Sequence, residues 1–162
     1  MGRNLLLSLA LAFAGTPAIA HLQHEKPAED SRATEERSFG RQGDAKQASR
    51  TIDVDMDDHL RYRPAKITVK QGETILFRVK NSGRAMHEMV LGTMGELKEH
   101  ARLMRQHASM AHDEPYMAHV APGATGTLVW QFDKPGEFYY GCLVPGHLEA
   151  GMVGTITVQK TK

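Results

Sequence analysis

The chain has 162 residues and a formal net charge of +1, from 20 basic and 19 acidic side chains. This balance excludes the strongly basic surface of a nucleic-acid-binding protein, and there is no acidic excess either. One cysteine excludes an internal disulfide, while nine histidines and nine methionines are more imidazole and thioether groups than an ordinary small domain needs.

The first twenty residues have the three parts of a secretory signal peptide. Arg3 supplies the positive charge, an apolar run covers Leu5 to Ala14, and Ala18-Ile19-Ala20 is a small-residue cleavage site. The run is too short to span a bilayer, and no later stretch resembles a membrane helix. We therefore predict cleavage after Ala20 and export to the periplasm as a mature chain that begins at His21. The alternative is an uncleaved N-terminal anchor.

Residues 21–50 are predicted to be a charged, disordered extension. Acidic and basic side chains are interspersed along it, and Leu22 and Phe39 are almost its only large apolar residues. A segment of this composition buries too little apolar surface to offset the entropy lost when it becomes ordered. A short solvated helix around residues 33–37 is the alternative.

Residues 51–162 have the pattern of an all-β domain. Short stretches alternate polar and apolar residues and are separated by Gly, Pro and Asn turn signals, which is typical of a sandwich or barrel. A bend is expected at Tyr62–Ala65. The predicted strands cover residues 51–56, 66–69, 74–80, 87–91, 126–132, 138–142 and 154–159.

One stretch of this domain lacks strand alternation. Residues 95–110 are rich in Glu, Leu, Lys, Ala, Arg and Met, which favour helix. We predict a helix here, followed by a loop at 111–125. The helix belongs to a His- and Met-rich insertion that covers about residues 94–118.

The stretch from Tyr140 to Met152 carries the strongest chemical signal. Four residues separate Cys142 from His147, and four more separate His147 from Met152. A thiolate, an imidazole and a thioether are three of the four ligands of a mononuclear blue-copper site, which uses two His, one Cys and a weak axial Met. Zinc prefers more thiolates or three imidazoles, so this set selects copper. Taken one by one, the same residues could be a buried hydrophobic thiol, a core methionine and a surface histidine.

The second histidine ligand must come from elsewhere in the chain. We choose His87, because it follows the turn at Asn81–Gly83 and opens a predicted strand, which is a rigid position. The other candidates are His59, His100, His107, His112 and His119. His100 and His107 fall on the predicted helix, and His112 and His119 in the loop after it, where a ligand is held less rigidly.

These features resemble the cupredoxin family, which includes plastocyanin, azurin, auracyanin and rusticyanin. The likeness covers residues 51–162. It rests on the Pro, apolar strand and Gly at 64–72, the Asn-x-Gly turn before Met86-His87, the Pro-Gly-x-Phe-x-Tyr-x-Cys stretch at 135–142, and the Cys-to-Met loop followed by the strand at 153–158. The loop spacing is similar to that of rusticyanin and auracyanin. The resemblance implies a Greek-key sandwich with one type 1 copper, in which His87, Cys142 and His147 are equatorial ligands and Met152 is the axial ligand.

One position departs from the family pattern. The residue after the first histidine is commonly Asn, Asp or Ser in cupredoxins, where it helps to link the two ligand loops by hydrogen bonds. Here it is Glu88. Its longer carboxylate can bond across the loops, face solvent or approach the metal, and the axial interaction, colour and reduction potential depend on which of these holds.

Further His and Met residues form a second set of candidate copper ligands. His100, Met104, His107 and Met110 are four, three and three residues apart, which places them on roughly one face of a helix. An N-terminal His21 would add a free amine beside its own imidazole. The full set is His21, His24, His100, Met104, His107, Met110, His112, Met117 and His119. The alternative is that Leu97, Leu103 and Met104 pack on the sandwich, the helix histidines are solvated, and the N-terminal histidines belong to an ordinary flexible tail.

Two functions of different classes follow from these observations. In copper tolerance, the protein would sequester copper or cycle it between oxidation states, and its extra His and Met residues resemble those of periplasmic copper-resistance cupredoxins of the CopI type. As an electron carrier, it would react with a partner such as a c-type cytochrome through His147, beside the apolar Leu143 and Val144. We favour copper tolerance, because an electron carrier does not need the extra soft ligands. An enzyme is not expected, since four protein ligands leave no open position on the metal.

Overall fold

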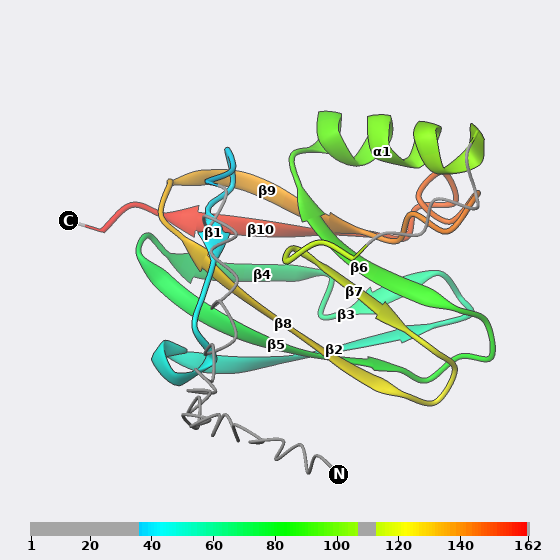
Figure 1. Cartoon of the computed structure of the whole chain (residues 1–162), viewed down its shortest axis with the longest axis horizontal. Coiled ribbons are helices and arrows are strands. Elements are labelled where there is room, and N and C mark those ends of the chain that lie inside the picture. The colour runs from blue at the N-terminus through cyan, green and yellow to red at the C-terminus, as the bar shows by residue number, and fades with distance from the viewer. Residues whose placement is uncertain (1–35, 107–112, 162) are drawn as a thin grey trace, which may run out of the picture. The chain divides into compact units, whose positions relative to one another are not determined.

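The structure is a computed structural model that describes residues 36–106 and 113–161 (Figure 1). The predicted signal peptide and residues 21–35 lie outside this part of the chain. The elements are β1 (Arg41–Gln42), the 3-10 helix η1 (Ala45–Gln47), β2 (Arg50–Asp57), β3 (Arg61–Arg63), β4 (Lys66–Lys70), β5 (Glu73–Asn81), β6 (His87–Gly92), α1 (Met94–Gln106), β7 (Met117–Val120), β8 (Thr125–Phe132), β9 (Gly136–Gly141) and β10 (Val153–Gln159).

The described strands form two five-stranded sheets, with the orders β1-β8-β5-β2-β3 and β4-β10-β9-β6-β7. The two sheets enclose a core, and α1 lies against the other face of the second sheet, over β6 and β9 (Figure 1). The predicted all-β sandwich with a helical insertion is confirmed. Within the described residues, no helix is long and apolar enough to cross a membrane.

The core is built from the alternating apolar residues of the predicted strands. Ile75, Phe77 and Val79 of β5 are completely buried, and the neighbouring β8 adds Trp130 and Phe132. Alternate side chains of a pleated strand point to the same face, which is why the sequence alternation predicted them correctly. Burying each side chain contributes roughly 1.5–3 kcal/mol.

The domain begins earlier than predicted. Phe39 lies in the segment expected to be disordered, yet it is only 2% exposed. Its ring stacks on that of Trp130 with 5.1 Å between centroids, and the Trp130 indole N–H donates to the Phe39 carbonyl at 2.9 Å. Arg41 and Gln42 then pair with β8. The expectation of disorder is therefore wrong for residues 36–50, because one aromatic side chain anchors an otherwise polar segment.

Two short strands lie where a bend and a loop were expected. β3 occupies the predicted bend and pairs with β2, and β7 occupies part of the loop predicted at 111–125 and pairs with β6. Both strands lie at sheet edges and have only three or four residues. So few residues cannot show a period-two pattern clearly, so these predictions were wrong.

α1 begins within one residue of its predicted start. Thr93 and Glu96 form a capping box, in which the Glu96 N–H donates to Thr93 Oγ1 at 3.3 Å and the Thr93 N–H donates to Glu96 Oε2 at 2.8 Å. Leu97 and Ala101 are buried against the sheet, whereas Leu103 is 42% exposed and does not pack on the sandwich as proposed. The predicted last turn, at residues 107–110, lies outside the described residues.

The anchoring role of Phe39 predicts a large loss of stability in Phe39→Ala. Truncating a buried Phe costs about 3–5 kcal/mol, through lost burial and the cavity left behind. Urea unfolding followed by circular dichroism should show this loss in the free energy of unfolding. Leu103→Ala is the matched control and should change it by less than about 0.5 kcal/mol. A similarly small change in Phe39→Ala would contradict the extended core.

Candidate metal centre

Three predicted ligand side chains converge at one end of the second sheet. One ring nitrogen of His87, one of His147 and Sγ of Cys142 all lie within 4.8 Å of one another. Sγ is 3.3 Å from Nδ1 of His147 and 3.9 Å from Nδ1 of His87. His87 and Cys142 are fully buried, and His147 is half-buried. Met152 is also fully buried and belongs to the same apolar cluster as Cys142.

Strand pairing brings these residues together. β6 pairs with β9 so that Val90 lies opposite Gly141, and β9 pairs with β10 so that Gly141 lies opposite Val153. His87 is the first residue of β6, Cys142 immediately follows β9, and Met152 immediately precedes β10. The register therefore places these three residues at the same end of the sheet, although they are far apart in the sequence.

Residues Cys142–Met152, here called the ligand loop, are held by backbone hydrogen bonds. The Cys142 N–H donates to the Met152 carbonyl at 3.2 Å, and the Met152 N–H donates to the His147 carbonyl at 2.9 Å. Inside the loop, the His147 N–H donates to the Val144 carbonyl at 3.0 Å. Gly146 has a φ of +88°, which a residue with a side chain rarely adopts. The predicted chain reversal at Pro145-Gly146 is confirmed.

The environment of Cys142 opposes a free thiolate. Burial raises the pKa of the Cys142 thiol to about 12, although the backbone N–H groups of Glu88 and Val144 donate to the sulfur and act in the opposite direction. At neutral pH the metal-free thiol is therefore protonated, and a metal must displace this proton to bind. Burial and the neighbouring His87 lower the pKa of His147, which keeps its imidazole neutral and able to donate a lone pair.

The donor atoms fit a copper ion. With a metal–nitrogen bond of about 2.0 Å and a metal–sulfur bond of about 2.3 Å, two ligand atoms in a trigonal plane lie roughly 3.7 Å apart. The two sulfur–nitrogen distances, 3.3 and 3.9 Å, bracket that value. One thiolate and two imidazoles, with a thioether in the same apolar cluster, suit copper better than zinc. The identity of the ligands remains a prediction that this geometry supports.

Glu88 does not link the ligand loops through its side chain. Its Oε1 lies 3.0 Å from Nδ1 of His119, which is opposite it on β7. Its Oε2 is buried and has no hydrogen-bond partner among the described residues. The backbone of Glu88 makes the link instead, because its N–H donates to Cys142 Sγ and its carbonyl accepts from the Tyr62 hydroxyl at 2.5 Å. Of the three arrangements that the sequence left open, none describes this carboxylate.

The secondary candidates are dispersed in the described part of the chain. His100 and Met104 lie on α1 and are half-buried, while Met117 and His119 lie on β7. No second group of three His, Cys, Asp or Glu donors comes together among the described residues. The remaining candidates, His21, His24, His107, Met110 and His112, lie outside them.

Asp58, which the sequence analysis did not single out, and Asn81 of the predicted Asn-x-Gly turn support His87. Asp58 Oδ1 lies 3.1 Å from Nε2 of His87, and Asp58 also accepts the backbone N–H groups of Arg84 and Ala85. These hydrogen bonds lower the pKa of Asp58 to about 2. The two backbone N–H groups have the largest effect, and His87 has a smaller one. Asn81 is completely buried and donates to the carbonyls of Ala85 and Val120 at 2.9 and 2.8 Å. The Asn-x-Gly motif signalled Asn81, but nothing in the sequence distinguished Asp58 from an ordinary turn residue.

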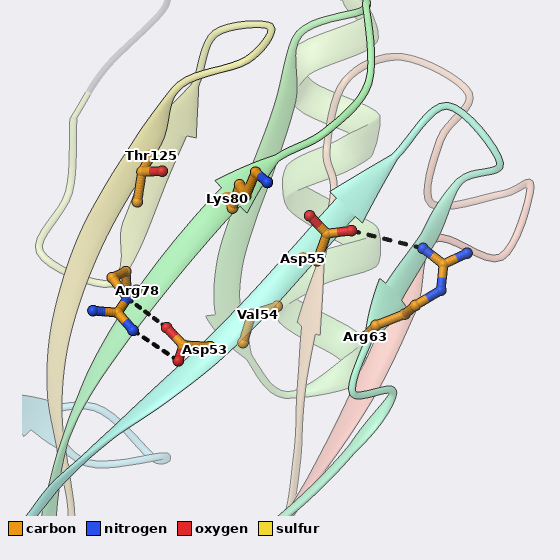
Figure 2. A pocket seen from close by; sticks show the side chains of 7 residues that line it. All are labelled: Asp53, Val54, Asp55, Arg63, Arg78, Lys80 and Thr125. Atoms are coloured by element: carbon orange, nitrogen blue, oxygen red, sulfur yellow. Dashed lines mark hydrogen bonds and ion pairs between the residues drawn. The ribbon is translucent and has the colours of Figure 1, made fainter.

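A surface pocket elsewhere has a different chemistry. Figure 2 shows it on the outer face of the first sheet, where Arg78 is paired with Asp53 and Arg63 with Asp55. Its lining residues are Asp53, Val54, Asp55, Arg63, Arg78, Lys80 and Thr125, which include none of the predicted metal ligands. Because its acidic groups are already paired with arginines, this pocket is not a candidate metal site.

Comparison with known sequences identifies close relatives. The family model described as "Copper binding proteins, plastocyanin/azurin family" matches residues 48–159. The copper-resistant cuproprotein CopI of Rubrivivax gelatinosus is 46% identical over 160 residues, which cover 97% of this chain and 96% of that protein. CopI of Pseudomonas aeruginosa is 34% identical over 151 residues, which cover 75% of this chain and 83% of that protein.

Comparison with solved structures agrees with the sequence matches. Auracyanin B superposes with a TM-score of 0.63 at 22% identity, over 74% of this chain and 96% of that chain, which shows the shared fold. Dithionite-reduced auracyanin of Roseiflexus castenholzii gives a TM-score of 0.55 at 27% identity, over 68% of this chain and 98% of that chain. Together with the convergent donors and the two-sheet fold, these matches show that the chain belongs to the plastocyanin/azurin family of copper-binding proteins, as a CopI-like cupredoxin.

Proposed function

We propose that this protein holds one copper ion in a type 1 site formed by His87, Cys142 and His147, with Met152 as the axial ligand. The convergence of three donor atoms within 4.8 Å carries this proposal. The donors come from two distant segments, and both His87 and Cys142 are completely buried. Burying a polar side chain without a partner costs free energy. Two buried side chains whose donor atoms face each other therefore indicate a site for a ligand.

The surroundings are suited to redox cycling with little movement. When bound, copper supplies a one-electron couple between Cu(II) and Cu(I). Backbone hydrogen bonds close the ligand loop from Cys142 to Met152, and the N–H groups of Glu88 and Val144 hold the sulfur. Because these contacts do not depend on the metal, they keep the donors in place in either oxidation state.

His147 is the accessible edge of the site. It is half-buried, and beside it Val144 is half-buried and Pro145 is exposed. Leu143, which was expected to join this apolar surface, is only 1% exposed because it packs in the cluster under α1. Exchange of copper or electrons is therefore proposed to occur at His147, next to Val144 and Pro145.

The biological role proposed is copper tolerance in the periplasm, with copper sequestered or cycled between oxidation states. CopI of Rubrivivax gelatinosus, named as a copper-resistant cuproprotein, is similar over nearly the whole chain, including the N-terminal residues read as a signal peptide. The alternative is an electron carrier with a redox partner such as a c-type cytochrome. The likeness to auracyanin, which has been solved in a dithionite-reduced form, is compatible with this alternative because it shows a similar protein in a reduced state.

We also propose a second, weaker copper-binding region on the insertion side of the domain. Glu88 and His119 support it, because their facing atoms are 3.0 Å apart and Glu88 Oε2 is a buried oxygen without a described partner. An imidazole and a carboxylate are both ligands for Cu(II). His100 and Met104 are the other described candidates on this insertion, and they lie apart from this pair on α1.

The primary site predicts an intense thiolate-to-copper absorption band. Adding Cu(II) to the mature protein should produce this visible band, and Cys142→Ser should abolish it, because no other cysteine can supply a thiolate. Met104→Leu is the matched control and should keep the band, since Met104 lies on α1. A band that survives in Cys142→Ser would refute the assignment.

The copper-tolerance role predicts a specific phenotype. Cells that lack the protein should grow poorly in high copper but respire normally, and wild-type protein should restore growth where Cys142→Ser does not. Growth curves with and without copper, together with oxygen consumption, test this. If cells that lack the protein tolerate copper normally, but their extracts reduce a purified c-type cytochrome more slowly than wild-type extracts do, the electron-carrier role is supported instead.

The second region predicts more than one bound copper per chain. Equilibrium dialysis of the mature protein should give a stoichiometry above one, and joint replacement of His100, His107 and His119 by Ala should lower it to about one without loss of the thiolate band. His59→Ala is the control, because the His59 side chain is 84% exposed in a hairpin on the other sheet. A wild-type stoichiometry of one contradicts the second region.

A further inference from the structure

Asp58 is not a predicted ligand, yet it is the described residue that contacts the outer nitrogen of His87. Its carboxylate lies in the loop between β2 and β3, and Oδ1 is 3.1 Å from Nε2 of the ring. The same carboxylate accepts the N–H groups of Arg84 at 2.8 Å and Ala85 at 3.1 Å. One acidic side chain therefore joins the β2–β3 loop to the segment that leads into β6.

The two nitrogens of His87 have different surroundings. Nδ1 faces Cys142 Sγ at 3.9 Å, whereas Nε2 faces the Asp58 carboxylate. A neutral imidazole carries its proton on one nitrogen and a lone pair on the other. A carboxylate can only accept a hydrogen bond, so it favours the tautomer with the proton on Nε2. The lone pair is then on Nδ1, the atom that faces the site.

We propose that Asp58 is a positioning residue that sets the tautomer, the orientation and the donor strength of His87 toward copper. The inference rests on the proposed copper site and adds a residue to it. A carboxylate that accepts the second N–H of a metal-bound imidazole fixes the ring and makes it a stronger base. A more basic imidazole stabilises Cu(II) more than Cu(I), so Asp58 lowers the reduction potential of the site.

The local backbone is shaped around this carboxylate. A Cβ on Gly83 would lie 2.2 Å from Asp58 Oδ1, so a residue with a side chain could not occupy this position without displacing Asp58. On the inner side of the same segment, the Asn81 amide donates to the Ala85 carbonyl at 2.9 Å. The segment before His87 is thus held from both sides, and the approach of Asp58 is a fixed feature of the fold.

A purely structural role is the competing explanation, because the bonds to Arg84 and Ala85 alone would stabilise the loop. The two explanations differ in the copper site itself. Asp58→Asn has nearly the same shape and keeps one acceptor oxygen, but it removes the negative charge that faces His87. A structural role predicts lower stability with an unchanged reduction potential, whereas the positioning role predicts a changed potential.

The first test compares Asp58→Asn with Asp57→Asn in copper-loaded protein, by spectroelectrochemical titration and competition for Cu(II) and Cu(I). Asp57→Asn removes the same charge from the adjacent residue, which contacts Arg63 and His59 and none of the predicted ligands. In Asp58→Asn, Cu(II) affinity should fall on the order of 10- to 100-fold, and Cu(I) affinity should fall less. Each tenfold fall in the ratio of Cu(II) affinity to Cu(I) affinity raises the reduction potential by about 59 mV for a one-electron couple. Asp57→Asn should stay near the wild-type potential.

The second test needs no variant and no metal. Long-range nitrogen–proton NMR of the metal-free wild-type protein should show His87 with its proton on Nε2. A proton on Nδ1, or equal potential shifts in Asp58→Asn and Asp57→Asn, would overturn the proposal. If Asp58→Asn does not fold, this spectrum decides alone. Absence of the thiolate band in wild-type protein would instead refute the copper site, so the two failures are distinguishable.

Discussion

The antiparallel register between β6 and β9 is the constraint on which the rest of the site depends. Val90 opposite Gly141 places His87 beside the start of the ligand loop, and no contact within the loop could do this. The register is determined by the buried faces of both strands, because a slip of one residue would turn every core side chain toward the wrong face. The thiol of Cys142 then lies in the core, where burial raises its pKa to about 12 and leaves a metal as the partner that favours its ionised form.

The helical insertion is physically coupled to this site. Leu97 and Ala101 of α1 form one buried cluster with Val90 of β6 and Leu143 of the ligand loop, and Arg105 forms an ion pair with Glu149 near the end of that loop. The helix therefore packs on the ligand loop and stabilises it. This contact gives the insertion a structural role that is compatible with copper binding by its histidines, since the packing uses the apolar face of the helix.

Much of the fold could be predicted from the sequence, and the errors in that prediction have physical causes. Long, alternating strands such as β5 and β8 were predicted correctly, because their pattern follows from one buried and one exposed face. The segment around Phe39 was misread, since average composition does not show that one aromatic ring stacks on Trp130. β7 was missed because it has four residues and gains its stability from pairing with β6. The capping box at Thr93 and Glu96 was present in the sequence and would have located the start of α1.

By itself, the sequence determined which donor types this protein carries and their order along the chain. Cysteine, histidine and methionine at fixed spacing in one loop are visible in the sequence alone, so this loop could be predicted to hold copper ligands without a structure. Only the tertiary structure decided the surroundings of those donors. It turned the Glu88 carboxylate toward His119 and brought Asp58, from a loop of the other sheet, to the outer nitrogen of His87. Such contacts depend on the packing of strands far apart in sequence, and no local pattern encodes them.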